Sequence, residues 1–351
     1  MADTPEFISV VVPVYNGARC IARCLDSLMH QTVAPDSYEI VVVDDGSTDE
    51  TVSIVRQYPV WCLTQPHSGA ATARNLGWRA AHGSLILFTD ADCRPASDWI
   101  ESLCAPFKDS RISGAKGVYR TCQRGLVARF VQLEYEEKYR RLAHQSKIDF
   151  VDTYSAAYRK SVLQAVGGFD DRFPNASVED QELSFRLAKS GYWLVFQPQA
   201  AVYHEHASHL LAYIRRKFRI GFWKALVHLR HPDKIVRDSH TPQSLKIQML
   251  LIATMAVTPG LGPALGWQVV LAAEGGLLLA SMMPLAGQVY ARDRAVLPIV
   301  PGMLIVRALA LAIGLMCGII IHLSGHLLQR SSPALAYDRL RKASRRPCER
   351  G

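Results

Sequence analysis

FISVVVPV at Phe7–Val14 and EIVVV at Glu39–Val43 are the two stretches that decide the fold. Each run is too short and too rich in β-branched residues for a helix, so each is predicted to be a buried strand of a parallel sheet. Between them, apolar residues recur three and four positions apart within Ala18–Met29, which predicts a helix that lays one face on the sheet. The three segments together predict a βαβ unit.

The alternation continues along residues 1–206. A helix is expected at Ala70–Ala81, a strand at Ser84–Thr89 (SLILFT) and a helix at Asp98–Phe107. This rhythm predicts an α/β fold, a Rossmann-like and mainly parallel sheet with flanking helices, whose ligand lies at the carboxyl ends of the strands. After about residue 110 the alternation weakens, and a charged helical stretch at Phe130–His144 precedes a loop-and-helix segment at Asp152–Gly191. We expect this half to shape the site for a second substrate.

The net charge of +9 over 351 residues is unevenly distributed. Residues 1–206 carry −4, residues 207–246 carry +7, residues 247–323 carry +1 and residues 324–351 carry +5. The positive charge therefore flanks an apolar region, where anionic lipid would attract it. This distribution argues against a nucleic-acid partner, which would require a basic surface on the folded domain.

The apolar region, 247–323, holds only five charged side chains and is interpreted as a membrane region. Trp267–Tyr290 and Val296–Leu323 are each long enough to span a bilayer, whereas 247–262 is short and ends in TPGLGP. Two spans with a shallow or re-entrant 247–262 are favoured, and three remain an alternative. Because basic residues accumulate on both sides, both flanks are expected in the cytoplasm.

Residues 209–230 place apolar side chains on one helical face, at Leu211, Ile214, Phe218, Phe222 and Leu229. We interpret 207–246 as a basic amphipathic segment at the bilayer surface; the alternative is an ordinary helix packed on the soluble domain. Residues 324–351 are expected to form a basic cytoplasmic tail. No charged segment followed by an apolar one opens the chain, so the N-terminal domain is expected on the cytoplasmic face of the inner membrane. The eight cysteines have no C-x-x-C or zinc spacing, which is typical of reduced thiols.

Polar residues follow three of the predicted strands. Tyr15 comes after VVPV, the pair Asp44 and Asp45 closes EIVVV, and Asp90 and Asp92 follow SLILFT. Two carboxylates at such spacing can hold a divalent cation, an aromatic ring can stack on a nucleobase, and strand-end carboxylates can accept hydrogen bonds from a base or ribose. Each group also has a plainer interpretation: a solvated turn, a helix start or a buried tyrosine. Taken together, they predict one crevice at the ends of neighbouring strands.

Five ordered motifs extend this pattern: VVPVYN, VVVDDGSTDET, GAATARNLGWRAAHGSLILFTDADCRP, VGGFDDRF and VEDQELSFRLAKSGY. In these motifs the chain resembles the family 2 glycosyltransferases with the GT-A fold, from about Ile8 to Gly221. The resemblance implies a membrane-attached member of bacterial type that needs a divalent metal, Mg²⁺ or Mn²⁺.

The resemblance also implies roles for individual residues. It implies that the nucleoside of a nucleotide-sugar is bound by Pro13, Tyr15, Asp44 and Asp45. It further implies that the diphosphate lies near Arg74 and that the ribose and metal are held by Asp90 and Asp92. Asp180, with Glu179 beside it, corresponds to the acceptor's base, although acidic residues also suit a helix start. His204 is similar to a histidine near the metal, with His206 as the competing choice. Ser155 stands where the family often has Asn, which concerns the acceptor contacts.

The predicted activity is inverting transfer of a sugar, most simply from a UDP-sugar, to a lipid-linked or polysaccharide acceptor at the membrane. The alternative is a non-catalytic membrane protein that binds a nucleotide-sugar. A nicotinamide enzyme and a P-loop protein are disfavoured, because neither G-x-G-x-x-G nor G-x-x-x-x-G-K-[ST] is present. A transporter is disfavoured because the predicted spans contain few polar residues.

Overall fold

The computed structural model describes residues 7–173, 178–236, 238–239, 241–261 and 266–327. Its N-terminal part is built around an eight-stranded sheet with the order β3-β2-β1-β4-β7-β6-β8-β5. The strands are β1 (Ile8–Val14), β2 (Tyr38–Asp44), β3 (Trp61–Thr64), β4 (Leu85–Phe88), β5 (Cys93–Pro95), β6 (Ile112–Arg120), β7 (Ala156–Arg159) and β8 (Trp193–His204).

The first half of the sheet is parallel, as predicted, because β2 and β4 flank β1 and β3 pairs with β2. The second half is mixed: β7 runs antiparallel to both β4 and β6, while β6 and β8 are parallel. Strands β6 and β8 escape the sequence patterns, since β6 contains Gly114 and Gly117 and Pro198 lies within the apolar run of β8. Glycine and proline both weaken a strand signal.

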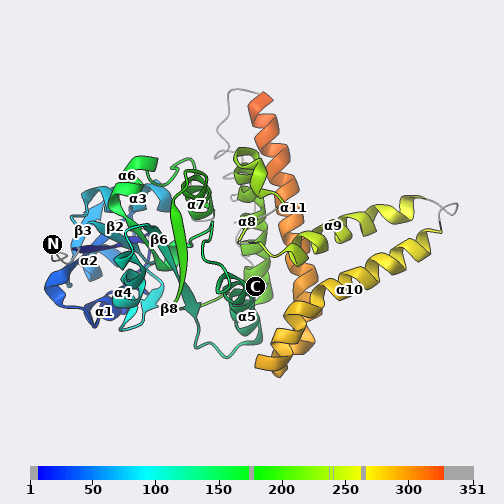
Figure 1. Ribbon diagram of the computed structural model, residues 1–351, viewed down its shortest axis with the longest axis horizontal. Coiled ribbons are helices and arrows are strands. Elements are labelled where there is room, and N and C mark those ends of the chain that lie inside the picture. Colours follow the sequence, from blue (N-terminus) through cyan, green and yellow to red (C-terminus); the bar gives the residue numbers. More distant parts are fainter. Residues whose placement is uncertain (1–6, 174–177, 237, 240, 262–265, 328–351) are drawn as a thin grey trace, which may run out of the picture.

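Helices cover both faces of the sheet (Figure 1). In β1, Val10 and Val12 belong to one apolar core and Val11 to the other, which explains why this strand is a continuous apolar run. The helices of this part are α1 (Ile21–Met29), α2 (Thr51–Val55), α3 (Ala70–Ala80), α4 (Trp99–Cys104), α5 (Leu126–Leu142), α6 (Lys160–Val166) and α7 (Glu179–Lys189).

Four longer helices follow: α8 (Leu210–Arg230), α9 (Gln243–Val257), α10 (Trp267–Arg292) and α11 (Val300–Leu327). In Figure 1, α8 and α11 run side by side at one edge of the sheet domain, and α9 and α10 project away from it as a pair. Among the residues that the structure describes, two segments are long and apolar enough to cross a membrane, Trp267–Arg292 and Arg294–His322. Helix α9 begins just before the predicted short segment, and the predicted tail lies outside the described residues from 328 onward.

Helix α8 packs closely on α11. A Cβ atom at Gly221 of α8 would lie 2.4 Å from the carbonyl oxygen of Leu311, and one at Gly314 would lie 2.2 Å from that of Phe218. Of the five apolar residues expected on one face, Phe222 is fully buried, whereas Leu211 and Leu229 are exposed. Helix α8 therefore joins the apolar C-terminal region to the sheet domain.

Candidate active site

Two cavities adjoin at the carboxyl ends of β1 and β4. The β1 cavity has a volume of about 490 Å³ and is bordered by Pro13, Tyr15 and Asp45, among others. The α7 cavity has a volume of about 500 Å³ and is bordered by Glu179 and Asp180. The residues common to both cavities are Arg74, Asp90, Asp92 and Arg219. The predicted crevice at the strand ends is therefore present, and most of the predicted site residues border it.

Tyr15 and His67 form an aromatic wall of the β1 cavity. Tyr15 is 43% exposed, so it is not the buried strand-end tyrosine of the plainer interpretation. Its ring stacks on the imidazole of His67 with centroids 3.9 Å apart, and His67 Nδ1 lies 2.8 Å from a carboxylate oxygen of Asp45. A planar ligand can stack against this wall.

The Asp45 carboxylate is occupied by the loop between β3 and α3. It accepts hydrogen bonds from the backbone N–H groups of Ser68 and Gly69, at 2.8 and 2.9 Å, and from the Gln65 amide at 2.6 Å. Asp44 is buried and accepts the backbone N–H of Ser47. Asp44 does not border either cavity. Asp45 is thus part of the wall of the β1 cavity, whereas Asp44 holds the turn at Ser47.

Arg74 connects the ends of β4 and α7. Its guanidinium is buried and donates to Asp90 at 2.9 Å and to Glu179 at 2.7 Å. Burial acts to lower the pKa of Arg74, but the two carboxylates outweigh it and raise that pKa. Its Nε has no hydrogen-bond partner among the described residues. Arg74 is therefore a fixed positive charge at the junction of the two cavities.

Asp92 and His204 form the best candidate metal site. His204 Nδ1 lies 3.5 Å from an Asp92 carboxylate oxygen and is buried without a hydrogen-bond partner among the described residues. The ligand atoms of Asp92, His204 and Cys93 all lie within 4.8 Å of one another. Burial raises the pKa of the Cys93 thiol well above its usual value, so this thiol stays protonated and is a poor ligand. A carboxylate and an imidazole fit a divalent cation, with Asp90 next to them.

The two histidines proposed for this role are clearly separated by their surroundings. His206 is buried and its Nε2 lies 2.9 Å from the amide oxygen of Gln132. Burial, reinforced by the charge of His204, lowers the pKa of His206 to about 3. His204 is therefore the histidine beside Asp92, and His206 belongs to the supporting structure.

Asp180 lies in the first turn of α7 and borders the α7 cavity. Burial, reinforced by the charge of the neighbouring Glu179 carboxylate and opposed by that of Arg74, raises the pKa of Asp180 to about 7. Lys116, fully buried nearby, forms an ion pair with Asp152. A carboxylate whose pKa lies near neutrality can exchange a proton at physiological pH.

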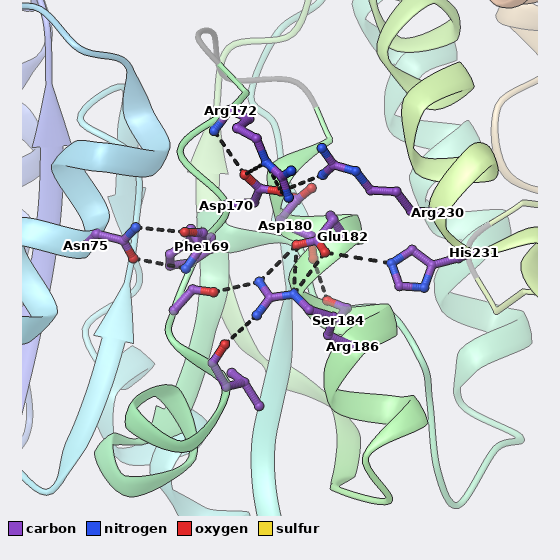
Figure 2. A network of polar contacts seen from close by, with 12 residues as sticks. Asn75, Phe169, Asp170, Arg172, Asp180, Glu182, Ser184, Arg186, Arg230 and His231 are labelled. Atoms are coloured by element: carbon purple, nitrogen blue, oxygen red, sulfur yellow. Dashed lines mark hydrogen bonds and ion pairs between the residues drawn. The ribbon is translucent and has the colours of Figure 1, made fainter. Parts of the chain in front are cut away.

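A polar network fixes the position of α7 (Figure 2). Ser184 donates to the backbone carbonyl of Asp180 at 2.6 Å, one turn earlier in the helix. Arg186 binds Glu182 and also the backbone carbonyls of Val166 and Gly168, at 2.6 Å each. These contacts hold α7, the helix that carries Asp180, against the end of α6.

Comparison with known proteins identifies the family of the N-terminal domain. Residues 9–167 match the model of Glycosyl transferase family 2. Residues 9–167 are therefore a glycosyltransferase family 2 domain. A pre-mycofactocin glycosyltransferase of Mycobacterium tuberculosis is 31% identical over 237 residues, which cover 65% of this chain and 48% of that protein. Glycosyltransferase AglE of Haloferax volcanii is 28% identical over 233 residues, covering 63% of this chain and 74% of that protein.

Solved structures agree on the fold. A mannosyltransferase of Pyrobaculum calidifontis, solved in complex with GDP-Man and Mn²⁺, aligns over 87% of each chain with a TM-score of 0.55 and 22% identity. The predicted GT-A fold is thereby confirmed. The chain spans about half the length of the mycobacterial relative that it matches.

Two arginines of α8 border these cavities, although the sequence patterns did not assign them to the site. Arg219 of α8 borders both cavities, and its Nε is buried without a hydrogen-bond partner among the described residues. Arg216 borders the α7 cavity and donates to the Tyr135 hydroxyl at 3.3 Å. Their three-residue spacing is a signal for one helical face, but the surrounding basic residues made the whole segment resemble a lipid-facing helix.

Ser155, which replaces the Asn frequent in the family, does not border the α7 cavity. It is buried, accepts a hydrogen bond from the indole of Trp99 at 2.9 Å and lies 3.2 Å from the carbonyl of Ala200. The cavity wall is formed instead by the preceding residues Asp152, Thr153 and Tyr154. Ser155 is therefore a packing residue of the domain core.

Proposed function

We propose that the chain is an inverting glycosyltransferase that moves a sugar from a nucleotide-sugar to a lipid-linked or polysaccharide acceptor at a membrane. The observation that carries this proposal is the position of Asp180, a carboxylate with a pKa of about 7 that faces the same cavity as Arg74, Asp90 and Asp92. This arrangement supports the proposal because a carboxylate able to act as a base borders the same cavity as charged groups suited to a departing diphosphate.

In the proposed reaction, Asp180 takes the proton of the acceptor hydroxyl as its oxygen attacks the anomeric carbon. The bond from that carbon to the diphosphate oxygen breaks on the opposite face, so the configuration inverts and the nucleoside diphosphate leaves with the electron pair. Arg219 and Arg216 approach from α8 and would bind the diphosphate as its negative charge grows. A divalent cation held by Asp92 and His204, with Asp90 beside it, would supply further stabilisation of that charge.

The donor is proposed to bind in the β1 cavity, with its base against Tyr15 and its diphosphate towards Arg74. Pro13 and Asp45 line this cavity. Asp45 holds the loop between β3 and α3, and Asp44 holds the turn that follows β2. We propose a UDP-sugar as donor. A GDP-sugar is the second donor to test, because the neighbouring mannosyltransferase was solved with GDP-Man.

We further propose attachment to the cytoplasmic face of the inner membrane. The two apolar segments Trp267–Arg292 and Arg294–His322 are long enough for two crossings. With basic residues on both sides of them, two crossings return the chain to the side of the catalytic domain.

The test is the Asp180→Asn variant of the full chain. Loss of the base should lower the rate of radiolabelled sugar transfer by about 10²–10⁴-fold. Donor binding, measured by thermal shift with Mn²⁺ present, should stay close to that of the original protein. Asp171→Asn is the matched control, since Asp171 is exposed and borders neither cavity. An Asp180→Asn protein that transfers sugar at the original rate would refute the base role. If the unaltered protein binds the donor but transfers no sugar, the non-catalytic alternative is favoured.

A further inference from the structure

The Asp45 carboxylate is fully occupied by the protein itself. A carboxylate has two oxygens with about four lone-pair sites for hydrogen bonds. One oxygen of Asp45 accepts the Gln65 amide at 2.6 Å and the Ser68 backbone N–H at 2.8 Å. The other accepts the Gly69 backbone N–H at 2.9 Å and lies 2.8 Å from His67 Nδ1. A bound base that donated to this carboxylate would therefore displace one of its present partners.

Displacing such a partner is unfavourable. Asp45 is only 3% exposed, and a buried donor that loses its acceptor costs more free energy than a typical hydrogen bond contributes. The loop that supplies the partners is also close to the turn after β2, where a Cβ atom at Gly46 would lie 2.8 Å from the His67 backbone nitrogen. Asp45 thus holds this loop in place, and the edge of the base is left to another group.

The contacts of His67 fix the position of the hydrogen on its imidazole. Its Nδ1 atom lies 2.8 Å from a carboxylate oxygen of Asp45 and 3.2 Å from the backbone carbonyl oxygen of the same residue. Both partners are acceptors, so Nδ1 carries the hydrogen and Nε2 of the neutral ring is an acceptor. No described residue donates to Nε2. The His67 side chain is 43% exposed and borders the β1 cavity, so Nε2 is available to a ligand.

The imidazole of His67 also sets the plane in which a base lies. Its ring makes an angle of 19° with the ring of Tyr15, on which it stacks. A hydrogen bond to a ring nitrogen lies in the plane of that ring, so a base that donates to Nε2 is nearly parallel to Tyr15. This is the orientation that stacking against the aromatic wall requires.

A hydrogen-bond acceptor at this place distinguishes between bases. Proteins recognise unpaired bases through hydrogen bonds to their Watson–Crick edges. Uracil has a ring N–H at N3 of that edge and guanine has one at N1, whereas the corresponding ring nitrogens of cytosine and adenine are acceptors. Two acceptors that face each other repel, and each loses the hydrogen bond that it made to water. Nε2 of His67 therefore favours a uracil or guanine nucleotide.

We propose that His67 recognises the base of the donor, through a hydrogen bond from the ring N–H of the base to Nε2. This inference rests on the proposed function, because it needs a nucleotide-sugar in the β1 cavity, and it narrows the donor to a uracil or guanine nucleotide. Asp45, which the resemblance connects with the nucleoside, is then a positioning residue. Its carboxylate orients the imidazole and keeps the hydrogen on Nδ1.

Isothermal titration calorimetry of the detergent-solubilised full chain, with Mn²⁺ present, tests the preference for the base. The buffer is at about pH 8.5, so that histidine side chains are neutral. UDP should bind at least about tenfold more tightly than CDP, and UDP methylated at N3, which has no ring N–H, should lose a similar factor. Equal affinities for UDP and CDP, or for UDP and its N3-methyl derivative, would overturn the proposal in the unaltered protein alone.

A variant locates the preference at His67. His67→Phe keeps a flat ring to stack on Tyr15 and removes both nitrogens. It should weaken UDP binding about three- to tenfold and leave CDP binding nearly unchanged, so that most of the preference for UDP disappears. A preference for UDP over CDP that is unchanged in His67→Phe would assign base recognition to another group and overturn the proposal.

His82→Phe is the matched control. His82 is also exposed, pairs through Nδ1 with a carboxylate, that of Glu39 at 3.0 Å, and contacts an aromatic ring, that of Trp61. It borders neither the β1 cavity nor the α7 cavity. His82→Phe should therefore keep the UDP and CDP affinities of the unaltered protein, and an equal loss of the preference in both variants would also overturn the role of His67.

Nucleotide binding and sugar transfer separate this inference from the proposed function. If UDP binds and Asp180→Asn abolishes transfer, but UDP and CDP bind equally well, only the assignment of His67 fails. If neither UDP, GDP nor CDP binds the unaltered protein in the presence of Mn²⁺, the proposed function itself fails.

Discussion

Gly221→Ala should uncouple the active site from the apolar helices. The added Cβ would lie 2.4 Å from the carbonyl oxygen of Leu311 and 3.1 Å from its Cα. These are backbone atoms and cannot rotate away, so α8 and α11 must separate by roughly 1 Å to restore ordinary contact distances. Overpacking of this kind costs about 1–3 kcal/mol, partly offset by the better helix propensity of alanine, about 1 kcal/mol. Because the clashing atoms are backbone, we expect the upper part of this range, a net loss of up to about 2 kcal/mol.

The displacement also reaches the chemistry, because Arg219 lies two residues before Gly221 on α8 and borders both cavities. A misplacement of about 1 Å can lower a catalytic rate by about 10²-fold. Gly221→Ala should therefore lower the melting temperature by several degrees and the sugar-transfer rate by about ten- to a hundredfold.

Gly276→Ala on α10 is the matched control, since a Cβ there meets no atom within 4 Å. Both variants are to be compared in the same detergent, by thermal unfolding and by radiolabelled transfer. The reasoning is refuted if Gly221→Ala retains the melting temperature and rate of Gly276→Ala, or if both variants lose them equally.

Three further predictions concern the chemistry. Asp180 must be deprotonated to act as a base, so kcat/KM should fall as the pH drops through about 7 and should level off above that pH. A flat profile of kcat/KM between about pH 5 and 9 contradicts this role. EDTA should abolish transfer, and Asp92→Ala should weaken donor binding measured with Mn²⁺; donor affinity that is equal with and without EDTA argues against the metal site. Arg219→Gln should reduce the rate of sugar transfer about ten- to a hundredfold, as expected for a lost charge-assisted hydrogen bond. Arg215 is an exposed neighbour on α8, so Arg215→Gln should not reduce that rate. Equal rates in the two variants would exclude Arg219 from the site.

The parallel half of the sheet could be predicted because each of its features is local. Strands β1 and β2 are apolar runs buried on both faces, and the polar residues that follow β1 and β4 lie where parallel strands end. The convergence of Tyr15, Asp90 and Asp92 follows from that topology alone. Strands β6 and β8 lacked a comparable signal, since glycines in β6 and a proline in β8 interrupt their apolar pattern.

The roles of individual polar groups needed the tertiary structure. The sequence predicted Asp44 and Asp45 for a nucleoside site. The fold adds that their carboxylates accept backbone N–H groups of the turn after β2 and of the next loop. The sequence also could not distinguish His204 from His206. His204 ends β8 and lies beside Asp92, whereas His206 lies in the following loop and contacts Gln132.

By itself, the sequence determined the parallel half of the sheet, the family 2 domain at residues 9–167, and the division into an acidic domain and an apolar region with basic flanks. Periodicity, composition and motif order are properties of neighbouring residues, so they can be read without coordinates. Only the tertiary structure decided that α8 brings Arg216 and Arg219 into the active site. Those contacts join segments that lie more than a hundred residues apart along the chain. Their geometry depends on how closely α8 and α11 approach each other at their glycines.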